Sequence, residues 1–466
     1  MIDQTREKLK TNRAVLLVSA TGSGKTRVAS KMIHGAVKKG FSALFTVHRQ
    51  ELMDQSIEAF QKEGIEHGCI AAGYDFNPAQ PVQIASIDTL RRRLEKFPYT
   101  PNLIVVDECA HSCSPTWKAV LDYFPKSRVV GLTATPERLD GKGLGNIYTA
   151  MVEGPSVRWL IDNKYLSPYE VFEPGIPDVS NLDTRAGDYA KEQNESLMDT
   201  PSITGDAIRE YQKHSAGKRA VAFCVSIKHS EHVAQQFRDA GISAIHVDGN
   251  TPRAQRKAAV NAFRAGDITI LTSVDIFGEG FDLPAMETAI LLRPTQSLAL
   301  YIQQVGRVLR PYPGKERALI LDHAGNVRRH FLPDEPRVWS LEGRKKKKKK
   351  EVENEVKIKI RNCTQCLFVH RPAPICPYCG FIYPVYGREV EHKPGELVRL
   401  DKAALAQQRK AAGIPVPNAD TREELEAIGI EQGYKNPFVW AEIKLAAREG
   451  REPNYAKANA RAKRNA

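Results

Sequence analysis

The sequence predicts an α/β protein with parallel sheets, followed by a small module built on four cysteines and a basic helical tail. Three observations indicate this fold class. Short apolar runs of strand length alternate with helical patterns, first over residues 14–136 and again over residues 220–310. Such alternation is typical of βαβ units and a parallel sheet. Four cysteines then gather within residues 363–379, and the last quarter of the chain is rich in Lys and Arg.

The size and charge of the chain limit its class. At 466 residues it is long enough for two or three domains. The net charge is +13, and ten of these charges lie beyond residue 340, where 26 Lys and Arg stand against 16 Asp and Glu. This basic appendage on a near-neutral body favours a nucleic-acid partner, and solubility alone is the alternative.

No apolar run in the sequence approaches the ~18 residues of a membrane span. The N-terminus also lacks the apolar segment of a signal peptide. We therefore expect a cytoplasmic protein with no membrane partner.

Residues 19–26 (SATGSGKT) carry the strongest chemical signal in the chain. An apolar strand pattern at 14–18 precedes them and a helical pattern at 27–33 follows, which is the context of a phosphate-binding loop. Gly22, Ser23 and Gly24 would let the backbone approach a polyphosphate. Lys25 would then reach the β- and γ-phosphates of ATP, and the Thr26 hydroxyl would bind Mg²⁺. The strict motif has Gly where this chain has Ser19, and a flexible Gly/Ser turn is the alternative.

A pair of carboxylates follows the apolar strand pattern at 103–106. Adjacent buried carboxylates are unfavourable unless a metal or a base role requires them. Asp107 is expected to hold Mg²⁺ through water, and Glu108 to orient the attacking water. A solvated acidic pair that opens a loop is the alternative.

Other predicted strands also end in polar residues, at the edge where ligands bind in open α/β sheets. The candidates for nucleic-acid contact are His48, Arg49, Ser86, Thr89 and, in the second half, Thr272. Ordinary helix capping is the alternative for the hydroxyl residues. Gln4, upstream of the phosphate loop, could read the adenine edge or could be a surface residue.

A predicted helix over 298–310 ends before Pro311. Gln303, Arg307 and Arg310 fall on one of its faces at spacings of four and three. Two arginines on a helix face are usually solvated. Because they follow a phosphate-loop domain, a role as arginine fingers that act across the domains is plausible.

The four clustered cysteines are Cys363, Cys366, Cys376 and Cys379. Two C-x-x-C turns place four sulfurs tetrahedrally around Zn²⁺. Disulfides are the alternative, which a reducing compartment disfavours. With four protein ligands such a zinc ion is structural, because no coordination position stays open.

The tail contains aromatic residues among Lys and Arg, which could stack on bases or could dock a helix onto the body. A block of like charge, residues 344–350 (RKKKKKK), precedes the cysteines and is expected to be a solvated linker that adds affinity for phosphates.

Taken together, the segments SATGSGKT, TVHRQEL, DECAH, GLTATPER, LTSVDIFGEGFDLP and YIQQVGRVLRP occur in the order found in superfamily 2 helicases and translocases. The chain resembles that superfamily over residues 1–322, and within it the RadD-like and phage-type DNA helicases that carry cysteine-pair zinc modules after the motor. The resemblance implies two tandem RecA-like domains with ATP bound between them. The expected domains are a RecA-like ATP-binding domain at 1–158, a second RecA-like domain at 159–343 with a linker or insertion near 159–210, a polylysine linker at 344–357, a zinc ribbon at 358–390 and a basic helical tail at 391–466.

The resemblance also implies residue roles. Thr133 and Thr135 would couple the ATP state to the DNA track, and Gly280 and Asp282 would lie at the domain interface near the nucleotide. Gln303, Arg307 and Arg310 would close on the γ-phosphate. One position departs from the family, which has His or Asp where this chain has Ala110, followed by His111.

The expected activity is that of an ATP-dependent DNA helicase or translocase. The alternatives are an RNA helicase with the same motor, or an ATP-switched adaptor that binds nucleic acid. The expected cofactors are ATP, Mg²⁺ and structural Zn²⁺.

Overall fold

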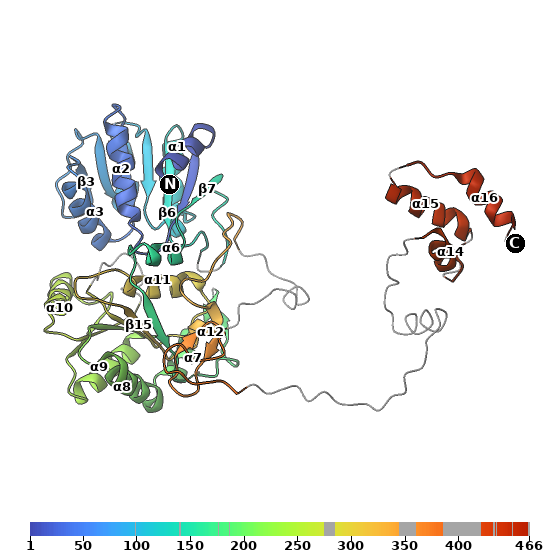
Figure 1. Cartoon of the computed structure of the whole chain (residues 1–466). Coiled ribbons are helices and arrows are strands. Elements are labelled where there is room, and N and C mark those ends of the chain that lie inside the picture. Colours follow the sequence, from blue (N-terminus) through green and yellow to red (C-terminus); the bar gives the residue numbers. More distant parts are fainter. Residues whose placement is uncertain are drawn as a thin grey trace. The chain divides into compact units, whose positions relative to one another are not determined.

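The structure is a computed structural model that describes residues 1–97, 99–138, 141–175, 177–185, 187–274, 285–343, 360–384, 421–431, 434, 436–449 and 451–464. Its contacts divide the chain into two units, Met1–Pro384 and Val385–Ala466 (Figure 1). No helix in the described part of the chain is long and apolar enough to cross a membrane.

The first half of Met1–Pro384 is built on a seven-stranded parallel sheet with the strand order β3-β4-β2-β5-β6-β1-β7. Its strands are β1 (Ala14–Val18), β2 (Ala43–Val47), β3 (Gly68–Ile70), β4 (Val82–Ser86), β5 (Leu103–Val106), β6 (Arg128–Thr133) and β7 (Ala150–Glu153). The helices of this half are α1 (Ile2–Thr11), α2 (Lys25–Val37), α3 (Gln50–Lys62), α4 (Ile87–Arg92) and α5 (Pro115–Tyr123), with 3₁₀ turns at Leu94–Lys96 and Cys109–His111.

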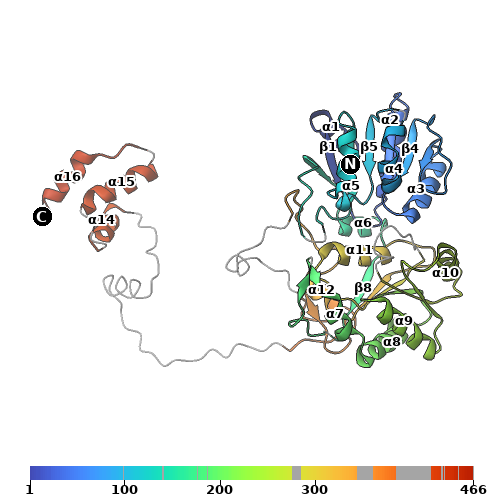
Figure 2. The same cartoon turned by 180° about the vertical axis from the view of Figure 1, so that it is seen from behind.

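Both faces of this sheet are buried, which explains its continuous apolar strands. Alternate residues of β1 point to opposite faces. Leu17 packs in the cluster that contains residues of α2 and α3, whereas Leu16 and Val18 pack in the cluster that contains residues of α5. In Figure 1, α2 and α3 lie in front of the sheet. In the reverse view of Figure 2, α4 and α5 lie in front of it, so they cover the opposite face.

The second half of this unit contains a six-stranded parallel sheet with the order β12-β13-β11-β14-β15-β8. Its strands are β8 (Tyr169–Phe172), β11 (Ala220–Phe223), β12 (Ala244–Val247), β13 (Ile270–Ser273), β14 (Thr288–Leu291) and β15 (Ala318–Asp322). Its helices are α6 (Val157–Asp162), α7 (Lys191–Met198), α8 (Pro201–Ser215), α9 (Ile227–Asp239), α10 (Arg253–Ala265), α11 (Leu298–Val308) and α12 (Asn326–His330). The two parallel sheets fit the tandem RecA-like architecture that the sequence predicts.

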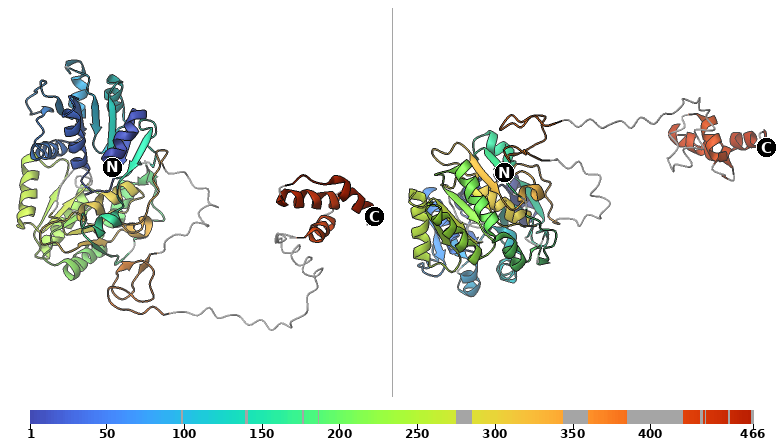
Figure 3. Two further views of the ribbon diagram at one scale, coloured as in Figure 1. Left: turned by 45° about the horizontal axis from the view of Figure 1, so that its top comes forward. Right: turned by 90° about the horizontal axis from the view of Figure 1, so that it is seen from below.

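Helix α11 lies between the second sheet and the first half of the unit, while α8 and α9 lie on the far side of that sheet (Figure 1). Seen from below, in the right-hand view of Figure 3, the green-to-yellow second half lies in front of the blue first half. The segment 159–210, predicted as a linker or insertion, supplies edge strand β8 and a short antiparallel pair, β9 (Thr184–Arg185) with β10 (Asp188–Tyr189).

The four-cysteine module is a small antiparallel ribbon of β16 (Arg361–Asn362) and β17 (Val369–His370). It packs on the edge strand β8. Phe172 of β8 forms an antiparallel bridge with Phe368, and the N–H of Glu173 donates to the carbonyl of Leu367 over 3.0 Å. The ring of Phe172 also contacts the rings of Phe368 and Tyr378, with centroids 5.5 and 5.2 Å away. The ribbon is therefore joined to the second sheet by backbone and by aromatic contacts.

The unit Val385–Ala466 contains helices α14 (Arg422–Glu431), α15 (Pro437–Glu449) and α16 (Tyr455–Arg464). A buried carboxylate organises it. Glu442, whose side chain is 1% exposed, forms ion pairs with Arg422 and with Arg451. It also accepts a hydrogen bond of 2.9 Å from the N–H of Asn454, at the start of α16. The Glu442 side chain on α15 thus joins the first residue of α14 to the segment between α15 and α16.

Candidate nucleotide site

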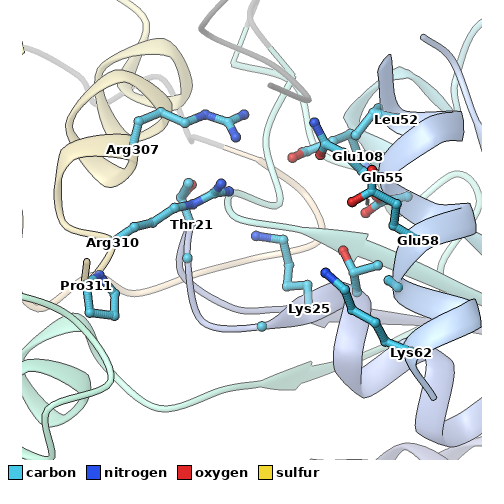
Figure 4. A pocket seen from close by; sticks show the side chains of 15 residues that line it. Thr21, Lys25, Leu52, Gln55, Glu58, Lys62, Glu108, Arg307, Arg310 and Pro311 are labelled. Atoms are coloured by element: carbon cyan, nitrogen blue, oxygen red, sulfur yellow. Dashed lines mark hydrogen bonds between the residues drawn. The ribbon is translucent and has the colours of Figure 1, made fainter. Parts of the chain in front are cut away.

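A cavity of ≈ 440 Å³ lies between the two halves of Met1–Pro384. It is lined by Thr21, Gly22, Gly24, Lys25, Thr26, Leu52, Gln55, Glu58, Ala59, Lys62, Asp107, Glu108, Arg307, Arg310 and Pro311. All but the last three come from the first half. Figure 4 shows Arg307, on α11, and Arg310, just after this helix, extending toward Lys25 and Glu108.

The loop between β1 and α2 has the conformation that phosphate binding requires. Gly22 and Gly24 have φ values of 83° and 84°, in the left-handed region that favours glycine. The Lys25 ammonium donates to the carbonyls of Ser19 (3.2 Å) and Ala20 (3.3 Å), so it lies inside the loop. Helix α2 begins at Lys25, which aims its N-terminal N–H groups at the cavity.

Ser19 replaces the usual first glycine of this motif without disturbing the loop. Its hydroxyl donates to the hydroxyl of Ser23 over 2.8 Å. On its other side lies Gly154, where a Cβ would come within 2.5 Å of the Ser19 Oγ. A glycine that is distant in sequence therefore makes room for this serine.

The charged groups of the cavity perturb each other. Burial lowers the pKa of Lys25, and the negative charges of Glu108 and Asp107 oppose this effect. Burial, followed by the neighbouring charge of Glu108, raises the pKa of Asp107 to about 7. Glu108 itself has a φ of 47°, which is unfavourable for a residue with a side chain and is typical of functional sites. Two carboxylates beside the Thr26 hydroxyl are oxygen donors that suit Mg²⁺, and Lys25 suits a polyphosphate.

The two halves come into close contact where α11 meets the phosphate loop. A Cβ at Gly306 would lie 2.5 Å from the Cβ of Thr21, and a Cβ at Gly22 would lie 3.1 Å from the Cγ of Arg310. Arg307 is only 4% exposed. The absence of side chains at Gly306 and Gly22 is what permits the arginines to enter the cavity.

Three of the other predicted nucleotide contacts are not brought into this cavity. Gln4 is exposed on α1 and does not line it. Gln303 is buried on α11, and its Oε1 has no hydrogen-bond partner within the described part of the chain, but it does not line the cavity either. Ser23 points back to Ser19. Gly280 and Asp282 lie outside the described residues.

Thr133 and Thr135 form a closed turn directly after β6. The Thr133 hydroxyl donates to the carbonyl of Thr135 (2.7 Å) and accepts from the Thr135 N–H (3.1 Å). The Thr133 carbonyl also accepts from the N–H of Ser19 over 2.9 Å. This turn is therefore bonded to the first residue of the phosphate loop.

The histidine after the unusual Ala110 lies beside another predicted contact residue. The rings of His111 and His48 are 4.9 Å apart between centroids and tilted by 46°. Both rings are partly exposed, as is Arg49. The strand ends of β2 and β5 thus bring these two motifs together.

The remaining hydroxyl candidates divide into two kinds. Ser86 and Thr89 are partly exposed at the start of α4, and the Ser86 side chain makes no capping hydrogen bond there. Thr272 is fully buried within the second half, where its hydroxyl donates to the Ser230 carbonyl over 2.8 Å. Its position gives no support to a nucleic-acid contact.

Sequence reasoning missed the face of α3 that lines the cavity. Leu52, Gln55, Glu58 and Lys62 follow one another at spacings of three and four, so they share one helix face. The available signal was this spacing in the helix that follows a strand with a polar end. It did not distinguish a cavity wall from a solvated face.

The four cysteines converge as the C-x-x-C spacing predicts. Their sulfurs all lie within 4.8 Å of one another. Cys363 and Cys379 are 3.7 Å apart, and Cys366 and Cys376 are 3.8 Å apart. Zn–S bonds of about 2.3 Å in a tetrahedron give an S–S separation of about 3.8 Å. The cluster is therefore compatible with a zinc ion.

The chain is similar to two protein families and to several individual proteins. The family described as "Type III restriction enzyme, res subunit" matches residues 1–138, and "Helicase conserved C-terminal domain" matches residues 203–312. A "51.5 kDa protein" of Lactococcus phage (isolate 7-9) is 36% identical over 70% of this chain and 68% of its own length. The "Putative ATP-dependent helicase IRC3" of Saccharomyces cerevisiae is 30% identical over 66% of this chain, but this chain spans only 48% of that protein. The "DNA 3'-5' translocase XPB2" of Sulfurisphaera tokodaii is 23% identical over 67% of this chain and 78% of its own length.

Proposed function

Because the chain belongs to the superfamily 2 helicases, which hydrolyse ATP in a nucleic-acid-dependent manner, we propose that it is an ATP-dependent DNA helicase or translocase. One observation carries this proposal: two arginines of the second half reach the same cavity as the phosphate loop and carboxylates of the first. The name of the Sulfurisphaera relative and the basic C-terminal quarter support DNA as the partner.

In the first half, Lys25 holds the β- and γ-phosphates of ATP, and the amides of the Gly22–Gly24 turn surround them. Asp107 and the Thr26 hydroxyl hold Mg²⁺, which neutralises phosphate charge when it is bound. Glu108 orients the attacking water from its position beside Asp107.

In the second half, Arg307 and Arg310 stabilise the charge of the transferring phosphoryl group. Gln303, one turn before Arg307, supports this face of α11 from its buried position. Because the arginines and Lys25 belong to different halves, ATP favours closure of the two halves and hydrolysis releases it. Alternate closure and release then advance the protein along DNA.

The track for DNA is proposed along the strand ends that carry His48, Arg49, Ser86 and Thr89. The turn of Thr133 and Thr135 links this edge to the phosphate loop through the bond to Ser19. Ala110 has no polar side chain with which to link the Asp107–Glu108 motif to the DNA track. His111, which packs against His48, makes this link in its place.

The four-cysteine ribbon holds one structural Zn²⁺. The tail adds salt-sensitive affinity for DNA. We propose the domain limits 1–158, 159–343, 358–390 and 391–466, with residues 344–357 as the linker.

The test is ATP hydrolysis with and without single-stranded DNA, duplex DNA, forked DNA and RNA. We expect DNA to stimulate hydrolysis, and we expect Lys25→Ala and Arg307→Ala each to reduce the stimulated rate by about a thousandfold or more. Lys31→Ala, on the exposed face of α2, and Arg264→Ala, exposed on α10, are matched controls that keep the rate. Circular dichroism checks that the variants stay folded. Normal ATP turnover by folded Lys25→Ala or Arg307→Ala contradicts the assignment. If RNA stimulates hydrolysis and DNA does not, the nucleic-acid partner is RNA.

A further inference from the structure

A second cavity, of ≈ 650 Å³, lies in the first half of Met1–Pro384. It is bounded by α1, by the C-terminal part of α2, and by the loops that lead into β2, β5 and β6. Its lining residues begin strands rather than end them, since Leu103 starts β5 and Arg128 starts β6. It therefore occupies the edge of the sheet opposite to the nucleotide cavity.

The rim of this cavity is uniformly basic. Five cations line it, Arg6, Lys10, Lys39, Lys126 and Arg128, and none of the described residues that line it is acidic. Three of the five have partners. Arg6 pairs with Asp3 and Lys10 with Glu7, in i,i+3 pairs that are largely exposed and weak. The Arg128 guanidinium donates to the carbonyl of Asn12 over 3.2 Å. Lys39 and Lys126 make no side-chain hydrogen bond or ion pair within the described part of the chain.

The floor of the cavity is apolar. We use the name floor for the apolar side chains among the lining residues, which are Leu9, Met32, Ala36, Phe41 and Leu103. Phe41 is a large apolar residue that stays 46% exposed, which is unfavourable unless something covers it. An apolar floor inside a positive rim calls for a ligand that combines apolar groups with negative charge.

Two classes of polyanion could meet this rim. Nucleic-acid bases bind by stacking on aromatic rings, and among the described lining residues Phe41 is the one aromatic side chain. The rest of the floor is aliphatic, which suits the side chains of a peptide. An acidic peptide offers carboxylates for the rim and an aliphatic or aromatic side chain for the floor, so the charge and the floor together favour it.

We propose that this cavity is a docking site for an acidic peptide segment of a partner protein, anchored by an apolar side chain between carboxylates. The site recruits the partner without blocking nucleotide. Helix α2 begins with Lys25 at the nucleotide cavity and carries Met32, Gly35 and Ala36 at the second one. At a rise of about 1.5 Å per residue, these positions lie about 10 to 16 Å along the helix from Lys25.

The experiment uses the full-length chain and a fluorescein-labelled peptide of Asp and Glu residues with a central Leu-Phe pair, followed by anisotropy at low salt. We expect saturable, salt-sensitive binding that Lys39→Glu/Lys126→Glu weakens by about tenfold or more. Phe41→Ala should also weaken binding, and a peptide with Ala-Ala in place of Leu-Phe should bind less tightly. Nucleic-acid-stimulated ATP hydrolysis should be unchanged in all variants, which also shows that they are folded.

The matched controls are Lys96→Glu/Lys118→Glu, two exposed lysines of the same half, and Tyr123→Ala, an exposed aromatic residue. These should bind the peptide as the unchanged chain does. Equal peptide binding by both double variants overturns the proposal. It is also overturned if an oligonucleotide of equal charge, rather than the peptide, depends on Lys39 and Lys126. Because ATP hydrolysis is read separately, failure here is distinguishable from failure of the proposed motor.

Discussion

At the scale of single residues, Gly306 decides how closely the two halves can meet. Its Cα faces Thr21 of the phosphate loop, and a Cβ placed there would come within 2.5 Å of the Thr21 Cβ. That separation is far shorter than a van der Waals contact. Gly306 belongs to helix α11 and Thr21 to the phosphate loop. The next residue, Arg307, reaches the cavity only if this approach is permitted.

We therefore expect Gly306→Val to reduce ATP hydrolysis by about a hundredfold or more, because the valine keeps the arginines from the phosphates. Binding of a fluorescent nucleotide to the phosphate loop should be retained, since Lys25 and Thr26 are untouched. The measurements are the rate of phosphate release from ATP and the affinity for the fluorescent nucleotide, compared between the variant and the unchanged chain.

The control for that change is Gly205→Val, on helix α8, where a Cβ meets nothing within 4 Å. It introduces the same β-branched residue into a helix without a steric conflict. If Gly306→Val and Gly205→Val hydrolyse ATP at the same rate, the activity does not depend on the close approach of residue 306 to Thr21.

At the scale of elements, the ribbon of β16 and β17 depends on its four sulfurs rather than on a core of its own. Its two strands are two residues long, which is too short for independent stability. A zinc ion bound by the four clustered sulfurs, together with the packing on Phe172, would supply the stability that the strands lack.

The purified chain should accordingly contain about one zinc ion, measured by elemental analysis, and Cys376→Ser should lose it. Cys69→Ser changes a thiol outside the cluster and should keep the metal. Hydrogen exchange at β8 and β17 should rise in Cys376→Ser alone. Full zinc content in Cys376→Ser would exclude the four-sulfur site.

Much of the element pattern could be predicted from the sequence. The runs at 14–18, 103–106 and 220–226 are apolar on both faces, and the structure places them within two parallel sheets. The cysteine spacing predicted the sulfur cluster because both C-x-x-C pairs are local. Edge strand β8 was not predicted, because its register depends on pairing with β15, which lies about 150 residues later.

The residues that line the nucleotide cavity were harder to predict, because they are brought together only by the tertiary structure. The spacing of Gln55, Glu58 and Lys62 fits any polar helix face, so it could not reveal what lies opposite. Thr272 shows the converse, since a hydroxyl in a strand of mixed composition became an internal donor to Ser230. The close approach of Thr21 and Gly306 joins residues from separate halves, so no local sequence pattern could predict it.

At the scale of the whole molecule, the chain divides into a motor unit, Met1–Pro384, and a terminal helical unit, Val385–Ala466. In the unit Val385–Ala466, the carboxylate of Glu442 is buried among cations. The hydrogen bond from Arg451, followed by that from the Asn454 N–H, lowers the pKa of Glu442 to about 2, from an ordinary value of 4.5. Since this pKa is lower in the folded than in the unfolded chain, the group stabilises the folded unit fully above about pH 4.5. That contribution is lost as the pH falls through about 2.

Glu442→Gln should therefore speed hydrogen exchange of residues 421–464 at pH 7 by roughly tenfold or more, because Arg422 and Arg451 lose a buried counter-charge. The variant should lose the extra acid sensitivity that the unchanged chain shows below pH 4.5. Glu449→Gln, a half-exposed carboxylate on the same helix, is the control. Equal exchange in all three chains would show that Glu442 does not hold this unit together.

The contact between the ribbon and β8 has a further consequence, for solubility. An outermost strand presents unpaired amides and carbonyls that can recruit a strand from another molecule. The bridge from Phe172 to Phe368 and the bond from Glu173 to Leu367 occupy part of that row. A chain that folded without the proposed zinc ion would leave these groups open to pairing with another molecule, so we expect aggregation to increase when zinc is withheld during synthesis.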